Sequence, residues 1–269
     1  MVKLMLFVML LAPFKSKAVS DTTIYHTLKR SRTYLYYPQS VERFYKANGY
    51  KLAWIAADTI KTHVWDGMLL LDCVRQYGLN HEDYHPKQLL YPELHKLIKQ
   101  NAKGEAAALY DIFLTDAIIR FINDLHYGKL NPVYTAEKID NGLKFKAYTE
   151  LMLALNSNDF DGVINSVQPK AKLYLDLQDH MRLLVGQRSG DCYLIPQGLI
   201  RKMAINMERL RWISTTGKKV HLTLIVRGGD VISYKDEYHQ DKQLERLLYN
   251  ESTTNKKHLT LNKIKSSGL

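Results

Sequence analysis

This 269-residue sequence has only two cysteines. It also lacks an apolar segment of membrane-spanning length and a long basic run. The apolar run from Leu4 to Phe14 is too short to cross a bilayer as a stable anchor. No cysteine stands directly after it, so a bacterial-type lipid anchor is not expected. No basic run is longer than a pair such as Lys256-Lys257, and the sequence contains no nucleic-acid-binding motif. Nucleic acid is therefore not an expected partner.

The two cysteines leave alternatives open. Cys73 and Cys192 could form one long-range disulfide in an oxidising compartment. Cys73 lies in an apolar run, however, and could equally be a buried small hydrophobe. As a nucleophile, Cys192 would need an adjacent base. The sequence around it supplies none, and His180 or His221 could approach only through the fold.

The N-terminus has the pattern of a secretory signal peptide. Lys3 precedes the apolar run, and Ser16 and Ala18 have the spacing of the small residues before a cleavage site. We therefore expect residues 1–18 to be a signal peptide, and the mature protein to be exported to the periplasm or cell envelope without a membrane span. An uncleaved membrane anchor is the alternative. Cleavage lowers the formal charge from +11 to +8, so the protein stays basic and meets anionic envelope polymers.

Apolar residues at helical spacing predict a mainly α fold with several helices. The expected helices are Pro38–Asn48, Thr62–Tyr77, Pro86–Gln100, Glu105–Tyr127, Lys146–Leu155, Phe160–Val167, Pro169–Val185 and Gln197–Trp212. In the longest of them, Asp116 is expected to pair with Arg120 one turn later, and Thr115 to bond a preceding carbonyl. A small β-hairpin is expected near Val220 to Tyr234, followed by a short helix near Gln240 to Leu248.

The segment from His81 to His85 matches the zinc-protease pattern His-Glu-x-x-His. That chemistry needs both imidazoles on one face of a continuous helix. Gly78 ends the preceding helix and Pro86 moves His85 out of the helical region, so a turn is expected here. A zinc hydrolase that uses His81 and His85 is one of three functional hypotheses for this sequence.

The segment from Ile200 to Trp212 combines apolar residues with three arginines and a lysine. A guanidinium group binds carboxylates bidentately and stacks on aromatic rings, which suits docking to a neighbouring domain. The candidate docking residues are Asn206, Met207, Glu208, Arg209, Arg211 and Trp212. The other interpretation is an amphipathic packing helix with a solvated basic side. If no domain covers it, Met207, Trp212 and Ile213 are expected to expose apolar surface that favours self-association or a partner.

Five short segments, in the same order, resemble the scaffold domain of large bacterial L,D-transpeptidases. They are Phe44-Tyr45-Lys46-Ala47-Asn48-Gly49-Tyr50 followed by Trp54, Gly78 to His85, Asp111 to Ala117, His126 to Pro132, and Asn206 to Trp212. The resemblance covers roughly Val41 to Trp212. It implies an exported, mainly helical protein from a family that forms 3→3 cross-links between peptidoglycan stem peptides.

In that family the last segment precedes a β-rich catalytic domain, which carries a Ser-His-Gly-Cys-x-Arg motif with a nucleophilic cysteine. This sequence contains no Ser-His-Gly-Cys, and Cys192 precedes the Asn206–Trp212 segment. We therefore expect no catalytic residue, no cofactor and no metal site. The leading hypothesis is a non-catalytic, cell-wall-associated protein that binds peptidoglycan or a cell-envelope protein. The alternative is a fragment of a complete L,D-transpeptidase whose catalytic domain was lost by truncation or frameshift.

The expected organisation follows from these segments. Residues 1–18 are the signal peptide, 19–37 an N-terminal extension and 38–213 the helical scaffold domain. Residues 214–250 are expected to be a small β/α remnant of a truncated catalytic domain, and 251–269 a flexible tail. The fold class is thus mainly α, a multi-helix scaffold domain with a small C-terminal β-hairpin remnant. The oligomeric state is not predicted.

Overall fold

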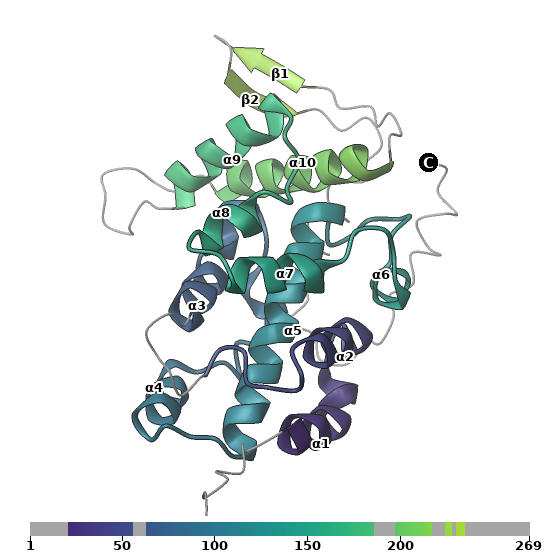
Figure 1. Cartoon of the computed structure of the whole chain (residues 1–269). Coiled ribbons are helices and arrows are strands. Elements are labelled where there is room, and N and C mark those ends of the chain that lie inside the picture. The colour runs from purple at the N-terminus through teal and green to yellow at the C-terminus, as the bar shows by residue number, and fades with distance from the viewer. Residues whose placement is uncertain (1–20, 56–62, 186–196, 217–223, 228–229, 235–269) are drawn as a thin grey trace, which may run out of the picture.

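Helix α5 (Glu105–Tyr127) runs through the middle of the molecule, and the other helices pack around it (Figure 1). This computed structural model describes residues 21–55, 63–185, 197–216, 224–227 and 230–234. The other helices are α1 (Asp21–Ser31), α2 (Pro38–Ala47), α3 (Val64–Asp72), α4 (Tyr91–Lys99), α6 (Ala136–Asn141), α7 (Ala147–Leu155), α8 (Phe160–Asn165), α9 (Lys172–Val185) and α10 (Gln197–Thr216). Short 3-10 turns cover Arg32–Tyr34, Val74–Tyr77 and His81–Asp83.

Helix α5 has the bounds that the sequence predicts, and it is buried on every side. Apolar side chains around its whole circumference, including Ile112, Leu114, Ile118 and Phe121, have no exposed surface. A helix that is apolar all round belongs in a core. It ends at Gly128, whose φ of +87° continues the chain in a conformation that disfavours other residues.

Most of the remaining predicted helices are confirmed with shorter bounds. The helix expected over Thr62–Tyr77 is α3 and a separate 3-10 turn, which meet at Cys73. The helix expected from Pro86 begins only at Tyr91, because His85 has a φ of +55° and Pro92 occupies the first turn. Two helices were not predicted, α1 and α6. Side chains of α1 nevertheless belong to the main core with α5.

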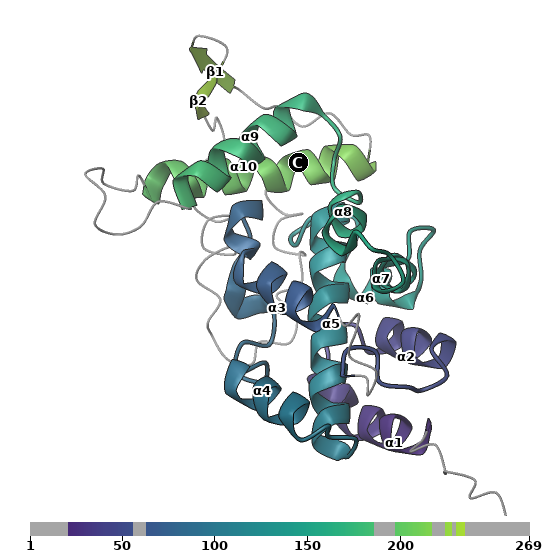
Figure 2. The same ribbon diagram turned by 60° about the vertical axis from the view of Figure 1, so that its left-hand side comes forward.

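Helices α9 and α10 lie across the C-terminal end of α5 (Figure 2). They share a second apolar cluster, in which Tyr174, Leu177 and Met181 of α9 pack against Met203 and Met207 of α10. The end of α5 is thereby covered by the last two helices. None of the described helices is long and apolar enough to span a lipid bilayer.

The expected fold class is corrected here. The class is mainly α. Within the described residues, β1 (Leu224–Arg227) and β2 (Asp230–Tyr234) form a two-stranded antiparallel ladder, with a register irregularity between Ile225 and Val226. Two strands alone cannot bury a core, so they add no β layer to the fold. The prediction of a β-hairpin remnant as part of the fold class is therefore wrong. The helix expected near Gln240 to Leu248 and the signal peptide lie outside the described residues.

Candidate functional site at the junction of helices α5 and α10

Helix α10 is buried on all sides over its central ten residues. Every residue from Met203 to Trp212 is buried, whereas Arg201 and Lys202 are exposed. The expectation of a solvated basic side is therefore wrong for Arg209 and Arg211. The reason is that α9, the end of α5 and the turn Val74–Tyr77 pack around this end of the molecule.

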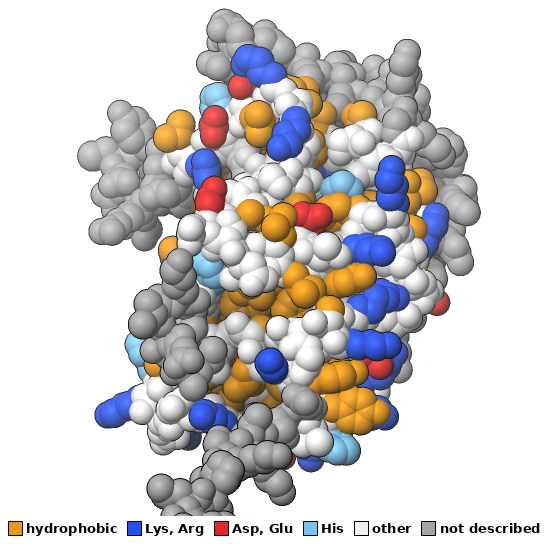
Figure 3. Space-filling view, in the orientation of Figure 1, with side chains coloured by type: hydrophobic (Ala, Val, Ile, Leu, Met, Phe, Trp, Pro, Cys, Tyr) orange, Lys and Arg blue, Asp and Glu red, His pale blue; other side chains and the backbone are white. Residues whose placement is uncertain are grey.

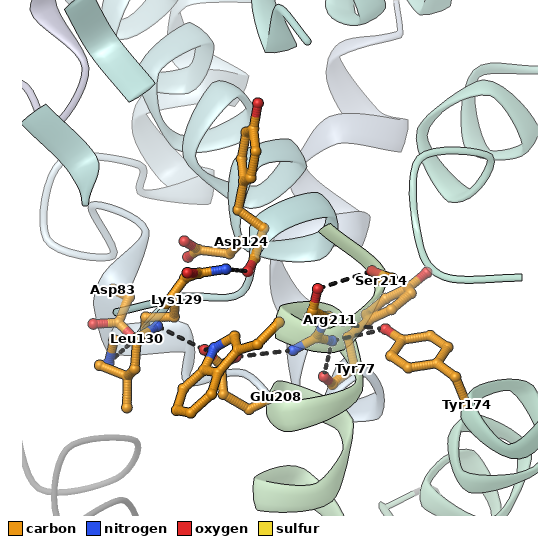
Figure 4. A network of polar contacts seen from close by, with 12 residues as sticks. Tyr77, Asp83, Asp124, Lys129, Leu130, Tyr174, Glu208, Arg211 and Ser214 are labelled. Carbon is orange, nitrogen blue, oxygen red and sulfur yellow. Dashed lines mark hydrogen bonds and ion pairs between the residues drawn. The ribbon is translucent and has the colours of Figure 1, made fainter. Parts of the chain in front are cut away.

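Arg211 is fully buried and links three parts of the chain (Figure 4). Its Nη2 donates to the carbonyl of Tyr77 at 2.6 Å and to the Tyr174 hydroxyl at 2.9 Å. Its Nη1 lies 3.4 Å from Glu208 Oε2, one turn earlier on α10. Burial lowers the pKa of Arg211, but Tyr174 and Glu208 outweigh that effect, and the net pKa is raised. The guanidinium group therefore stays charged inside the protein.

Glu208 joins α10 to the chain that follows α5. One carboxylate oxygen accepts a hydrogen bond from the backbone N–H of Leu130 at 2.6 Å and another from Trp212 Nε1 at 2.8 Å. Gly128 is required here for a second reason. A Cβ at this position would lie 2.7 Å from Glu208 Oε1 and from atoms of the Trp212 ring. The carboxylate and the indole thus fill the space that a side chain at position 128 would need.

A second buried polar cluster lies beside this junction and holds Asp83, Arg120, Asp124 and Lys129. Arg120 Nη2 is 3.2 Å from Asp83 Oδ1, and Arg120 Nε is 3.6 Å from Asp124 Oδ2. Lys129 Nζ lies 2.9 Å from the other oxygen of Asp83. The Arg120 guanidinium also stacks over the ring of Tyr36, at 3.9 Å from its centroid. The two cations balance the two carboxylates, which is what burial of charge requires.

Asp124 gives this cluster a pH dependence. Burial raises its pKa to about 6, although Arg120 opposes the shift. The carboxyl has a pKa of about 3.9 in an unfolded chain, so the folded protein binds this proton more tightly. The stability from that difference is full below about pH 4 and is lost as the pH rises through 6.

Asp124→Asn should remove this part of the pH dependence, because the amide stays neutral. We expect the free energy of unfolding of the native protein to fall, relative to the variant, by about 1–3 kcal/mol between pH 4 and pH 7. Urea unfolding of both proteins at the two pH values measures the difference. Parallel declines in both proteins would contradict the assignment to Asp124.

Two acidic residues in the first half of α5, Asp111 and Asp116, accept hydrogen bonds from backbone N–H groups of earlier segments. Asp111 is fully buried and accepts hydrogen bonds from the N–H groups of Ala53, Trp54 and Ile55 and from the Tyr45 hydroxyl. These contacts fix the chain after α2 against α5.

Asp116 and Thr115 have partners other than those the sequence suggests. Asp116 accepts from the backbone N–H groups of Tyr36 and Tyr37 at 2.8 and 2.9 Å. His85 Nε2 lies 2.7 Å from the same carboxylate. The predicted pairing of Asp116 with Arg120 is therefore wrong, since Arg120 turns to Asp83 and Asp124. Thr115 contacts the Tyr45 hydroxyl and Trp54 Nε1 instead of a preceding carbonyl.

The His81–His85 segment forms a turn. His81 to Asp83 is a single 3-10 turn, and no helix continues through His85. His81 Nε2 lies 3.6 Å from Asp72, whereas His85 faces Asp116. Among the described residues, no group of three or more His, Cys, Asp or Glu side chains is placed to hold a metal ion. The predicted turn is confirmed, and a zinc hydrolase site finds no support in this segment.

Cys73 has no disulfide partner within the described part of the chain, and Cys192 lies outside it, so their pairing stays a prediction. Burial raises the pKa of the Cys73 thiol.

Met207 is fully buried and Trp212 is 8% exposed. The expected exposed apolar patch at these two residues is therefore wrong.

All six candidate docking residues are buried within the scaffold itself. They are Asn206, Met207, Glu208, Arg209, Arg211 and Trp212. Docking to a separate domain stays a prediction. The sequence indicated the chemistry of this helix, charge pairing beside an aromatic ring, but not its partners. Those partners, Tyr77, Leu130 and Tyr174, carry no local signal that points to α10.

The fold and its buried polar links define a helical framework built around one central helix. A family model described as "Scaffold domain" matches residues 39–181, from α2 into α9. The match covers more than half of the chain, and the chain belongs to this family. Neither a curated protein nor a solved structure matches it. Helix α10 lies beyond the matched residues, although its side chains complete the contacts of the residues within them.

Proposed function

We propose that this chain is an exported, non-catalytic protein of the bacterial cell wall, related to the scaffold region of L,D-transpeptidases. It would hold peptidoglycan or a cell-envelope protein and form no cross-links itself. The membership of the Scaffold domain family supports a scaffold role. Export and association with the wall rest on the sequence alone. The link to L,D-transpeptidases rests on the five sequence segments that resemble that family's scaffold.

One observation carries the proposal: polar contacts connect all five segments into one set. Tyr45 of the first bonds Asp111 of the third, and His85 of the second bonds Asp116 of the third. The further links are Asp83 of the second segment with Lys129 of the fourth, and the Leu130 N–H of the fourth with Glu208 of the fifth.

These linking groups are buried or largely buried, so they hold the framework together and present little to a substrate. A buried polar group without its partner costs free energy. Both partners of each link are therefore needed, although they lie far apart in the sequence. Their chemistry is that of a rigid support. A function in positioning other molecules follows more directly from this arrangement than one in bond-making.

Purified protein incubated with disaccharide tetrapeptides tests whether the chain is catalytic. We expect no 3→3 cross-linked dimer when the muropeptides are separated and identified by mass spectrometry. A dimer that appears with the native protein and disappears with Cys192→Ala would refute the non-catalytic assignment. A second arm measures whether the protein sediments with purified sacculi, since a wall-associated protein must do so.

The alternative, a fragment of a complete L,D-transpeptidase, makes a different prediction. Sequencing the DNA downstream of the reading frame would then reveal an open frame that encodes Ser-His-Gly-Cys. Export is tested separately: the protein recovered from the periplasmic fraction should begin at Val19, after removal of residues 1–18.

A further inference from the structure

Six cations lie along one side of the molecule, over α1, α2 and the loop between α6 and α7. Figure 3 shows a column of Lys and Arg side chains over the side on which α6 and α2 lie in Figure 1. We name this set the basic strip. Its members are Lys29, Arg43, Lys46, Lys51, Lys144 and Lys146.

Contacts between the elements hold the strip together. Arg43 and Lys46 are one turn apart on the side of α2 away from the buried Phe44 and Tyr45. Arg43 Nη2 donates to the carbonyl of Asp140 at 2.8 Å, which places it beside the start of the loop that carries Lys144 and Lys146. Helix α2 also packs against both α6 and α7.

The other end of the strip is fixed by two tyrosines. The rings of Tyr25 and Tyr50 meet edge to face, with centroids 5.5 Å apart. Lys29 Nζ sits 4.4 Å above the Tyr25 ring, and Lys51 directly follows Tyr50. The strip therefore continues from α2 onto α1 without a break in packing.

The charges of the strip are not neutralised within the described part of the chain. No carboxylate oxygen lies within 4 Å of any of the six cations there. Some exposed cations elsewhere are paired, such as Arg30 with Glu105 and Lys172 with Asp176. Two acidic residues on the elements of the strip are engaged with other groups: Glu42 pairs with Arg32, and Asp140 caps the start of α2 through the N–H groups of residues 39 and 40.

We propose that the basic strip binds the carboxylates of peptidoglycan stem peptides, an inference that rests on the proposed function. Positive charge spread along a line suits a polymer that carries negative groups at intervals better than a single small anion. Five of the six cations are lysines, whose flexible stems adapt to irregularly spaced carboxylates. The one guanidinium group, that of Arg43, is engaged with Asp140 and Gln39. It offers no free fork of the kind that favours phosphate in nucleic acid or lipid headgroups.

The test compares two variants of the full chain that change net charge equally. The strip variant carries Lys46→Glu, Lys51→Glu, Lys144→Glu and Lys146→Glu. The control variant carries Lys87→Glu, Lys99→Glu, Lys103→Glu and Lys170→Glu, at four exposed lysines outside the strip. Circular dichroism and the midpoint of thermal unfolding confirm that both variants fold.

Sedimentation with purified sacculi at low salt measures binding. We expect the strip variant to bind roughly 10-fold or more weakly than the native protein, because four cations that attract the carboxylates become anions that repel them. The control variant should stay within about 3-fold of the native protein, and the native affinity should fall as salt screens the charges. Amidation of the sacculus carboxylates with methylamine should abolish the difference between the native protein and the strip variant.

Equal weakening in both variants would overturn the proposal, since net charge alone would then explain binding. Unchanged sacculus binding by the strip variant, with loss of binding to phosphatidylglycerol vesicles or to single-stranded DNA, would also overturn it and assign the strip to that partner. Failure of the native protein to bind sacculi would instead count against the proposed wall association. That outcome differs from the one that overturns only the role of the strip, in which the native protein and the strip variant bind sacculi equally.

Discussion

Arg211→Met is expected to destabilise the protein by about 3–5 kcal/mol at pH 7. The substitution leaves the Tyr77 carbonyl and the Tyr174 hydroxyl without their buried donor, and removes the cation that faces Glu208. Methionine occupies similar space but provides no hydrogen bond. Urea unfolding followed by far-ultraviolet circular dichroism measures the loss.

The matched control is Lys202→Met, at an exposed cation on the same helix. We expect it to change stability by no more than about 0.5 kcal/mol. A double variant, Glu208→Gln with Arg211→Met, should recover part of the loss, because no uncompensated charge then remains buried. A loss below about 1 kcal/mol for Arg211→Met alone would show that the buried link does not hold α10 in place.

Asp111→Ala is expected to have an effect at least as large, of about 4 kcal/mol or more. Three backbone N–H groups and the Tyr45 hydroxyl lose their shared acceptor, and each unsatisfied buried donor costs about 1–3 kcal/mol. Water that enters the space left by the carboxylate reduces this sum. The free energy of unfolding at pH 7 is the measurement.

Asp111→Asn separates hydrogen bonding from charge. Its amide oxygen can accept some of the four donors, while its NH₂ group faces donors in place of acceptors, so an intermediate loss is expected. Glu93→Ala serves as the surface control, because Glu93 is exposed and pairs only loosely with Lys96 at 3.9 Å. If Asp111→Ala and Glu93→Ala were equally mild, the carboxylate would not be what anchors residues 53–55 to α5.

The sequence predicted a helix well where its apolar period and its start and end residues lie within the segment itself. Helix α5 has the expected bounds because its apolar period and its terminal glycine are both visible within the segment. Helix α4 starts later than expected, since the left-handed backbone at His85 cannot be recognised from the proline after it. Helix α1 was missed within a short polar segment, although Ile24 and Leu28 are buried in the core.

The candidate site was harder to predict because its partners are distant in the chain. Arg211 reaches the carbonyl of Tyr77, 134 residues earlier, and Asp116 caps the backbone at Tyr36, 80 residues earlier. A helix with charged residues on several sides resembles a solvent-exposed one by composition alone. Burial reverses that interpretation for Arg209 and Arg211, because neighbouring helices supply their surroundings.

The long reach of Arg211 also sets an order of events during synthesis. At synthesis rates of about 5–20 residues per second, the 134 residues from Tyr77 to Arg211 take roughly 7–27 s to emerge from the ribosome. Throughout that interval the Tyr77 carbonyl lacks its donor on α10. Once α9 has emerged, its apolar face also lacks the helix that covers it. The nascent chain therefore reaches its final packing only once α10 has left the exit tunnel, and a holding chaperone would find its binding surface at this end of the molecule.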